Sequence, residues 1–189
     1  MNRYIIGFLA FIGLGILLTV LLIGGGSNNK VQQHATTKPK LLYDYANTSA
    51  EVKMVIDGPI VSPEKHNSVV VTVGQNSANF ELIQGYDGNV ISSKSYNNTE
   101  NSYRNFLYAI YYAGFSDGVK SNVSSDIGLC ASSDRYDFYL INGSRILKHY
   151  WTTNCGGDPR TFGGLLNTVI SLFRKQIPDY NQLSQQANI

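Results

Sequence analysis

The sequence predicts an α+β domain, in which a mainly antiparallel sheet carries two packed helices, preceded by one N-terminal transmembrane helix. Three observations support this prediction. Six runs of alternating or β-branched residues read as strands, two amphipathic segments read as helices, and a charge-free apolar run stands near the amino terminus. The predicted order is ββββ-α-ββ-α, and no repeat of fixed period is present.

The chain divides into four predicted parts. Residues 1–25 form the transmembrane anchor, 26–49 a flexible tether, 50–180 an extracytoplasmic α+β domain, and 181–189 a disordered tail. The tether begins with GGGSNNKVQQHATTKPK and the tail is NQLSQQANI, and both are polar without hydrophobic periodicity.

The anchor is predicted from residues 4–23, which carry no charge. Twenty helical residues span about 30 Å, the thickness of the bilayer hydrocarbon, so we expect the lipid bilayer to be a partner of this segment. A cleaved signal peptide is the alternative, although the apolar run exceeds the usual ~7–15 residues and GGGSNN does not resemble an A-x-A cleavage site. Charge does not settle the orientation, because Arg3 precedes the segment while Lys30, Lys38 and Lys40 follow it.

A disulfide is predicted between Cys130 and Cys155, the two cysteines of the chain. They flank two strand-like runs joined by Asn142-Gly143, a dipeptide typical of a two-residue type I′ hairpin turn. The resulting register pairs Ile141 with Ser144 and, continued outward without a slip, sets the cysteines opposite each other. Further out it pairs Phe138 with Leu147, Asp137 with Lys148, and Tyr136 with His149.

This disulfide also bears on localisation. Disulfides persist mainly outside the reducing cytosol, so the pairing predicts a domain on the outer side of the cell membrane. Two unrelated buried thiols are the alternative.

The first four strands are predicted at 51–57, 68–74, 79–86 and 89–96. Between the last two, Asp87-Gly88 predicts a second two-residue hairpin, whose register sets Glu81 opposite Lys94 as a favourable charge pair.

Both helices are predicted from their caps and apolar stripes. Thr99 is the expected N-cap of the first and Gly114 its end, whereas Asp158 or Thr161 caps the second and Pro178 ends it. The apolar stripes are Tyr103, Phe106, Leu107, Ile110 and Tyr111 in the first helix, and Phe162, Leu165, Leu166, Val169 and Phe173 in the second.

Little in the sequence indicates catalysis. No nucleophile-elbow or phosphate-loop motif occurs, and no pair of carboxylates can be singled out as a glycosidase pair. We predict no metal site and no cofactor, because no further cysteine and no suitably spaced histidine complete a ligand set. A net charge of +2 does not suggest a nucleic-acid partner. A surface hydrolase acting on envelope or host material remains the alternative function, with His66 or His149 as its base.

A binding role has more support. The chain contains 13 tyrosines with abundant serine, asparagine and glycine, a composition favoured by binding surfaces. Arg104, Tyr108 and Tyr112 are predicted on the side of the first helix away from its apolar stripe, where they could stack on a glycan ring or anchor a partner protein. The alternative is that this short helix is buried on both sides, so that these residues have no binding role. We therefore favour a binding or structural module of the cell envelope, contacting an envelope or host-surface protein or glycan.

Several segments resemble a family of small membrane-anchored proteins from Saccharibacteria-like bacteria with reduced genomes. They are IDGPIV, QGYDGNVISSKSY, YYAGFSDG, CASSDRYDFYL, WTTNCGG, TFGG and LFRKQIPDY. The resemblance covers the whole predicted domain and implies a bacterial host and an extracytoplasmic location. It implies no activity and no catalytic residues.

Overall fold

The computed structural model describes residues 40–187, and the fold below is that of this part of the chain. The predicted anchor and residues 26–39 of the predicted tether lie outside the described residues. Within residues 40–187, no helix has both the length and the apolar character needed to span a bilayer.

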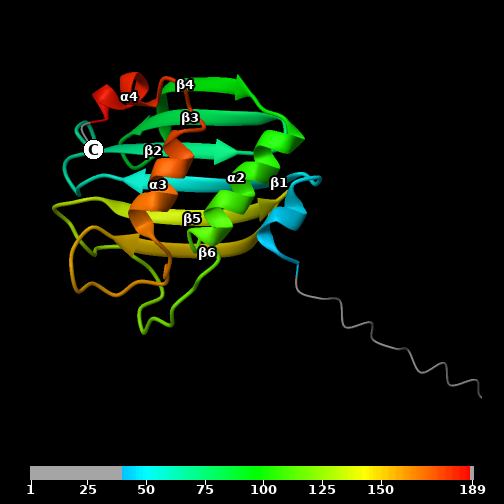
Figure 1. The fold of residues 1–189 in the computed structure, drawn as a ribbon. Helices are drawn as coiled ribbons and strands as arrows, with labels where there is room; N and C mark the ends of the chain where they lie inside the picture. The colour runs from blue at the N-terminus through cyan, green and yellow to red at the C-terminus, as the bar shows by residue number, and fades with distance from the viewer. Residues whose placement is uncertain (1–39, 188–189) are drawn as a thin grey trace, which may run out of the picture. The chain divides into compact units, whose positions relative to one another are not determined.

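Six strands form one antiparallel sheet in the order β4-β3-β2-β1-β5-β6 (Figure 1). The strands are β1 (Ala50–Asp57), β2 (Asn67–Val73), β3 (Ser77–Gln84), β4 (Asn89–Asn97), β5 (Arg135–Asn142) and β6 (Arg145–Thr153). The predicted antiparallel α+β class is confirmed, and the elements follow one another along the chain as predicted, with one further short helix after the second. Because β1 pairs with both β2 and β5, the two halves of the sheet meet on this strand.

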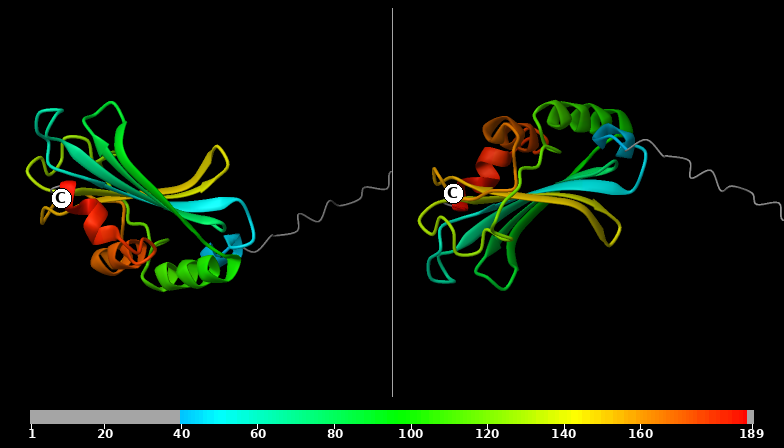
Figure 2. Two further views of the ribbon diagram at one scale, coloured as in Figure 1. Left: turned by 90° about the horizontal axis from the view of Figure 1, so that it is seen from above. Right: turned by 90° about the horizontal axis from the view of Figure 1, so that it is seen from below.

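Two helices, α2 (Glu100–Tyr112) and α3 (Leu166–Arg174), cover one face of the sheet (Figures 1 and 2). Alternate residues of β1 supply the core on this face, and Val52, Met54 and Ile56 are at most 1% exposed. Phe173 of α3 packs edge-to-face on Phe106 of α2, with ring centroids 5.1 Å apart. The side chains that alternate with these core residues lie on the opposite face of the sheet, which is called the open face below.

The first helix begins and ends where the sequence predicts. The Thr99 hydroxyl accepts the Ser102 N–H at 3.2 Å, and Gly114 adopts a φ of 82° after the last turn. Gly114 also has no room for a side chain, since a Cβ there would lie 2.8 Å from the Gly164 Cα.

The second helix begins later than predicted, after Leu165, which makes no side-chain cap. Neither predicted cap is available to the helix. Asp158 accepts a hydrogen bond from Thr153 at 2.9 Å, and Thr161 bonds to the backbone of Trp151. Leu165 is exposed rather than part of the apolar stripe, and the helix ends at Arg174, before it reaches Pro178.

The β5–β6 hairpin has a different register from the one predicted. Asn142 pairs with Arg145, so Gly143 and Ser144 occupy the turn, and only Gly143 has a positive φ (58°). A positive φ at the first central position alone is typical of a type II′ turn, not of type I′. Leu147 is an additional, bulged residue, because Ile141 pairs with Ile146 and Leu140 with Lys148.

This shift changes the cross-strand pairs. The predicted partners Phe138/Leu147, Asp137/Lys148 and Tyr136/His149 are wrong, and the observed ones are Phe138/Tyr150, Asp137/Trp151, Tyr136/Thr152 and Tyr139/His149. Lys148 therefore does not lie opposite Asp137, and His149 does not lie opposite Tyr136.

The β3–β4 hairpin is also looser than predicted. Gln84 pairs with Asn89, so four residues form the loop, and Ile91 is bulged. Lys94 consequently lies opposite Phe80, not opposite Glu81. Its ammonium group forms an ion pair with Asp179 instead.

Both ends of the described chain pack more tightly than predicted. Residues 42–45, expected in the tether, form the 3-10 helix η1 (Leu42–Tyr45), and Leu42 is buried. The predicted disordered tail contains most of α4 (Tyr180–Leu183), all of η2 (Ser184–Gln186), and the buried Ala187. The Asn67 amide donates to the Ala187 carbonyl at 3.2 Å, which ties this end to β2.

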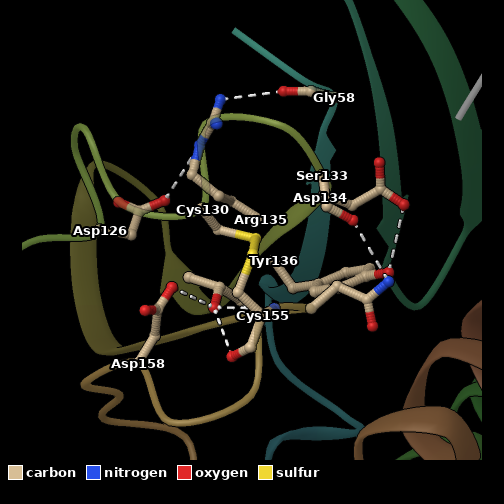
Figure 3. Close-up of a disulfide and its surroundings, with 11 residues drawn as sticks. Gly58, Asp126, Cys130, Ser133, Asp134, Arg135, Tyr136, Cys155 and Asp158 are labelled. Carbon is tan, nitrogen blue, oxygen red and sulfur yellow. Dashed lines mark hydrogen bonds and ion pairs between the residues drawn. A yellow bond between two sulfur atoms is a disulfide. The ribbon is translucent and has the colours of Figure 1, made fainter.

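Cys130 and Cys155 form a disulfide, with Cα atoms 5.6 Å apart (Figure 3). It lies outside the β5–β6 ladder, which ends at the pair Arg135/Thr153. The predicted partners are therefore correct although the predicted register is wrong, because a turn from Cys130 to Ser133 returns the chain toward β6 (Ser133 N to Cys130 O, 3.1 Å). Cys130 has a φ of 46°, in the left-handed region that non-glycine residues rarely adopt.

Replacing both cysteines by serine should lower the free energy of unfolding by about 3 kcal/mol, the loss expected for opening a loop of this length. Urea unfolding of the oxidised protein and of the double variant measures the difference. Reductant should bring the wild-type protein to the stability of the variant and leave the variant unchanged. Equal stability of the two oxidised proteins would contradict this prediction.

Candidate functional site

An exposed group of aromatic rings lies where η1 meets α2. We call the residues Tyr43, Tyr108, Tyr111 and Tyr112 the tyrosine cluster. Tyr43 stacks on Tyr108 with ring centroids 4.4 Å apart and meets Tyr111 edge-on at 5.4 Å. Tyr112 lies 5.3 Å from Tyr108 and 5.4 Å from Tyr111. Four rings from two segments therefore form one continuous aromatic surface.

The cluster is exposed at its outer end. Tyr112 is 70% and Tyr108 43% exposed, whereas Tyr111 is half-buried against the core. The described residues therefore do not bury α2 on both sides. The pKa of Tyr112 is raised, first by its side-chain hydrogen bond with Tyr108, and the pKa of Tyr43 is raised, first by desolvation. These hydroxyls stay neutral at physiological pH and can act as hydrogen-bond donors and acceptors.

The predicted ligand-binding residues differ in their availability. Tyr108 and Tyr112 lie side by side, one helical turn apart, as their spacing predicts. Arg104 is one further turn away, and its guanidinium pairs with Glu100 at 2.5 Å. Tyr43 could not be assigned to this surface from the sequence, because it lies in a segment predicted to be a tether.

A small pocket adjoins the cluster. It has a volume of about 180 Å³ and a mostly apolar lining, to which Tyr111 and Tyr45 contribute. Lys40 and Lys148 also line this pocket, and the Lys40 ammonium lies 4.0 Å from the centre of the Tyr45 ring. Aromatic faces, an apolar depression and two cations thus occur together on this side of the domain.

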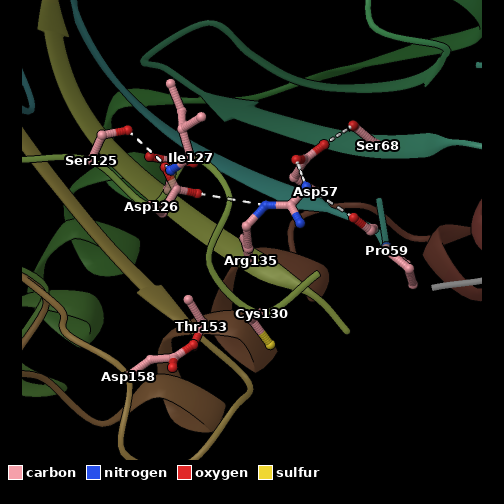
Figure 4. Close-up of polar contacts among 12 residues, drawn as sticks. Asp57, Pro59, Ser68, Ser125, Asp126, Ile127, Cys130, Arg135, Thr153 and Asp158 are labelled. Carbon is pink, nitrogen blue, oxygen red and sulfur yellow. Dashed lines mark hydrogen bonds and ion pairs between the residues drawn. The ribbon is translucent and has the colours of Figure 1, made fainter. Parts of the chain in front are cut away.

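A second group of polar side chains lies at the end of β1, where His66, Ser68 and Arg135 are buried around the half-buried Asp57 (Figure 4). Asp57 accepts hydrogen bonds from the Ser68 hydroxyl at 2.5 Å and from His66 Nε2 at 3.0 Å, and it forms an ion pair with Arg135. Arg135 is only 4% exposed, donates to the Gly58 carbonyl at 3.0 Å, and lies 3.8 Å from Asp126.

This group contains serine, histidine and aspartate but lacks the geometry of a catalytic triad. In a catalytic triad, one ring nitrogen of the histidine accepts the serine proton, and the other ring nitrogen donates a hydrogen bond to the aspartate. Here Ser68 donates to Asp57 itself, and the Ser68 hydroxyl and Asp57 lie 3.4 Å and 3.0 Å from the same ring nitrogen of His66, Nε2. The other ring nitrogen, Nδ1, faces the Pro59 carbonyl at 3.0 Å. Both ring nitrogens of His66 thus face oxygen atoms, and neither is left free to accept a proton from a serine in the way a triad requires. Ser68 and His66 are also buried, which withholds them from a substrate.

The other candidate base, His149, lies on the open face. Its Nε2 bonds to Asp137 at 2.6 Å, and its ring stacks on Tyr139 at 4.3 Å. Burial raises the pKa of the Asp137 carboxyl, and the hydrogen bond to His149 opposes this effect. Lys53 lies 4.4 Å from the centre of the Tyr139 ring. Among residues 40–187 no hydroxyl or thiol bonds to His149, so the arrangement is that of a cross-strand stack.

The ligand atoms of Cys130, Cys155 and Asp158 lie within 4.8 Å of one another. Cysteine binds metals as thiolate, whereas both sulfur atoms here are consumed by the disulfide. Asp158 is engaged with the Thr153 hydroxyl. The oxidised protein therefore offers no thiolate ligand at this position.

Comparison with known proteins adds no assignment, since no family model matches the sequence and no curated protein is significantly similar to it.

Replacing Asp57 by asparagine should lower the free energy of unfolding by about 3 kcal/mol, because it leaves the buried Arg135 guanidinium without its carboxylate partner. Thermal or urea unfolding near neutral pH measures this loss. Glu81, on the same open face, makes no ion pair with any described residue, so Glu81→Gln should stay within about 0.5 kcal/mol of wild type. Equal effects of the two substitutions would contradict the role given to Asp57.

Proposed function

We propose that the protein is a membrane-anchored extracytoplasmic module that binds an envelope or host-surface protein or glycan through the tyrosine cluster. The observation that carries this proposal is the exposed aromatic surface formed by Tyr108 and Tyr112 over Tyr43. Adjacent exposed tyrosines present broad, rigid apolar area together with polar hydroxyl groups, at a small cost in conformational entropy.

The geometry suits ligands with a flat apolar face and polar edges. The CH faces of a sugar ring, or an aliphatic or aromatic side chain of a protein, can lie on the tyrosine rings while the hydroxyls bond to the ligand. Lys40 and Lys148 beside the adjoining pocket favour a ligand that also carries negative charge. The buried Asp57 group and the His149 stack supply no comparable accessible surface, so the hydrolase alternative gains no support from them.

The Tyr108→Ala/Tyr112→Ala double variant should weaken binding to isolated envelope fragments by about tenfold or more, because exposed aromatic anchors commonly dominate binding energy. Co-sedimentation of the full chain with such fragments measures this loss. Pretreating the fragments with protease distinguishes a protein ligand from a glycan.

Circular dichroism should show that the double variant remains folded, and Ile127→Ala serves as the matched control. Ile127 is 87% exposed and lies outside the cluster, so this variant should bind like wild type. Undiminished binding by the folded double variant would refute the assignment of the site.

The location is proposed from the apolar segment 4–23 and the disulfide. In intact cells, a membrane-impermeant maleimide should label the protein only after reduction, because both cysteines would be oxidised and outside the membrane. Labelling of lysates without reductant, together with none in intact cells, would place the domain in the cytosol. Since the chain has two cysteines, no other thiol contributes to the signal.

A further inference from the structure

The two edges of the sheet differ in how well they are covered. At β6, the Thr161 hydroxyl accepts the Trp151 N–H at 2.8 Å, and the Trp151 carbonyl accepts the N–H groups of Thr161 and Phe162 at 2.9 Å. The outward backbone groups of Trp151 are thus already bonded. Exposed Arg145 and Lys148 further protect this edge from pairing with another strand.

The β4 edge has no such cover among residues 40–187. Seven of its nine residues are exposed, and no described strand pairs with its outer side. An edge strand directs alternate N–H and C=O groups outward, where they can pair with a further strand. The features that usually prevent this are weak, because β4 has no proline and its one charged residue, Lys94, is engaged by Asp179.

The strand is complementary to itself in an antiparallel orientation. Beyond the bulged Ile91, residues 92–97 pair with β3 in one uninterrupted register, so this segment is a regular strand. When two copies of this segment are aligned about Ser95, Lys94 lies opposite Tyr96 and Ser93 opposite Asn97. The Lys94 ammonium already lies 5.3 Å from the centre of its own Tyr96 ring. Alignment about Lys94 would instead oppose two ammonium groups, which is unfavourable.

We propose that β4 pairs with β4 of a second copy of this chain, with Ser95 opposite Ser95, so that the two sheets continue into one another. The occupant is a second copy because this alignment joins lysine to tyrosine and serine to asparagine and leaves no like charges opposed. The proposal does not depend on the proposed binding function, since it uses a different edge of the domain from the tyrosine cluster.

The oligomeric state tests this proposal directly. The full chain, kept in detergent, should have the protein mass of a dimer by light scattering after size exclusion. Ser95→Lys should convert it to a monomer, because two ammonium groups would then face each other at the symmetry axis. Ser144→Lys adds the same charge at the exposed turn beside the other sheet edge and should remain dimeric. A monomeric wild type would overturn the proposal, whether β4 is then free or covered by residues of its own chain.

Cross-linking tests the register. Opposed residues of an antiparallel pair have Cα atoms about 4.5–5.5 Å apart, within disulfide range, so Ser95→Cys should form a covalent dimer on non-reducing gels. Ser93→Cys is the matched control. It is exposed on the same face of β4, but its counterpart would lie about 14 Å away along the strand, out of disulfide range. Cross-linking through position 93 alone, or a dimer that persists in Ser95→Lys, would refute the proposed pairing.

Discussion

The ion pair between Asp57 and Arg135 joins parts of the domain that are far apart in the sequence. These residues are cross-strand partners at the end of β1 and the start of β5, on the open face of the sheet. Asp57 also bonds to Ser68 at the start of β2 and to His66 just before that strand, and Arg135 reaches Asp126 in the long connection between α2 and β5. A guanidinium buried in this way is tolerated when carboxylates match its charge, and Asp57 and Asp126 supply them. Its Nη2 is also bonded to the Gly58 carbonyl, whereas its Nη1 has no partner among the described residues. In the same connection, Cys130 lies five residues before Arg135 and is joined by the disulfide to Cys155, which follows β6.

The sequence predicts the elements of this fold better than it predicts how they are paired. The alternation in β1 and the apolar stripe and caps of α2 are local signals, and the structure agrees with them. The two hairpin registers differ from the predicted ones for two reasons. The turns are closed by other pairs, Asn142/Arg145 and Gln84/Asn89, and the bulged residues Leu147 and Ile91 then shift the pairs beyond them. An Asn-Gly dipeptide indicates a turn but does not say which residues are central. In β5–β6 the glycine takes the first central position, with serine second.

The tyrosine cluster shows the same division between local and tertiary information. Helical spacing places Tyr108 next to Tyr112, and this much is visible in the sequence. The addition of Tyr43 depends on η1 packing against α2, which brings together residues more than sixty positions apart, and no local pattern marks that contact. Similarly, the late start of α3 follows from the pairing of residues 161–163 with β6 and with the segment after α2, which removes Thr161 from its predicted role as a cap.

The position of the last described residues has a consequence for biosynthesis. Phe173 of α3 contacts the rings of Phe106, Phe115 and Phe138, and Ala187 is bonded to a side chain of β2. These contacts close the core with residues that follow all six strands and α2 in the chain. During synthesis the strands and α2 therefore emerge before α3, and the part of the apolar face that α3 covers stays open until α3 follows.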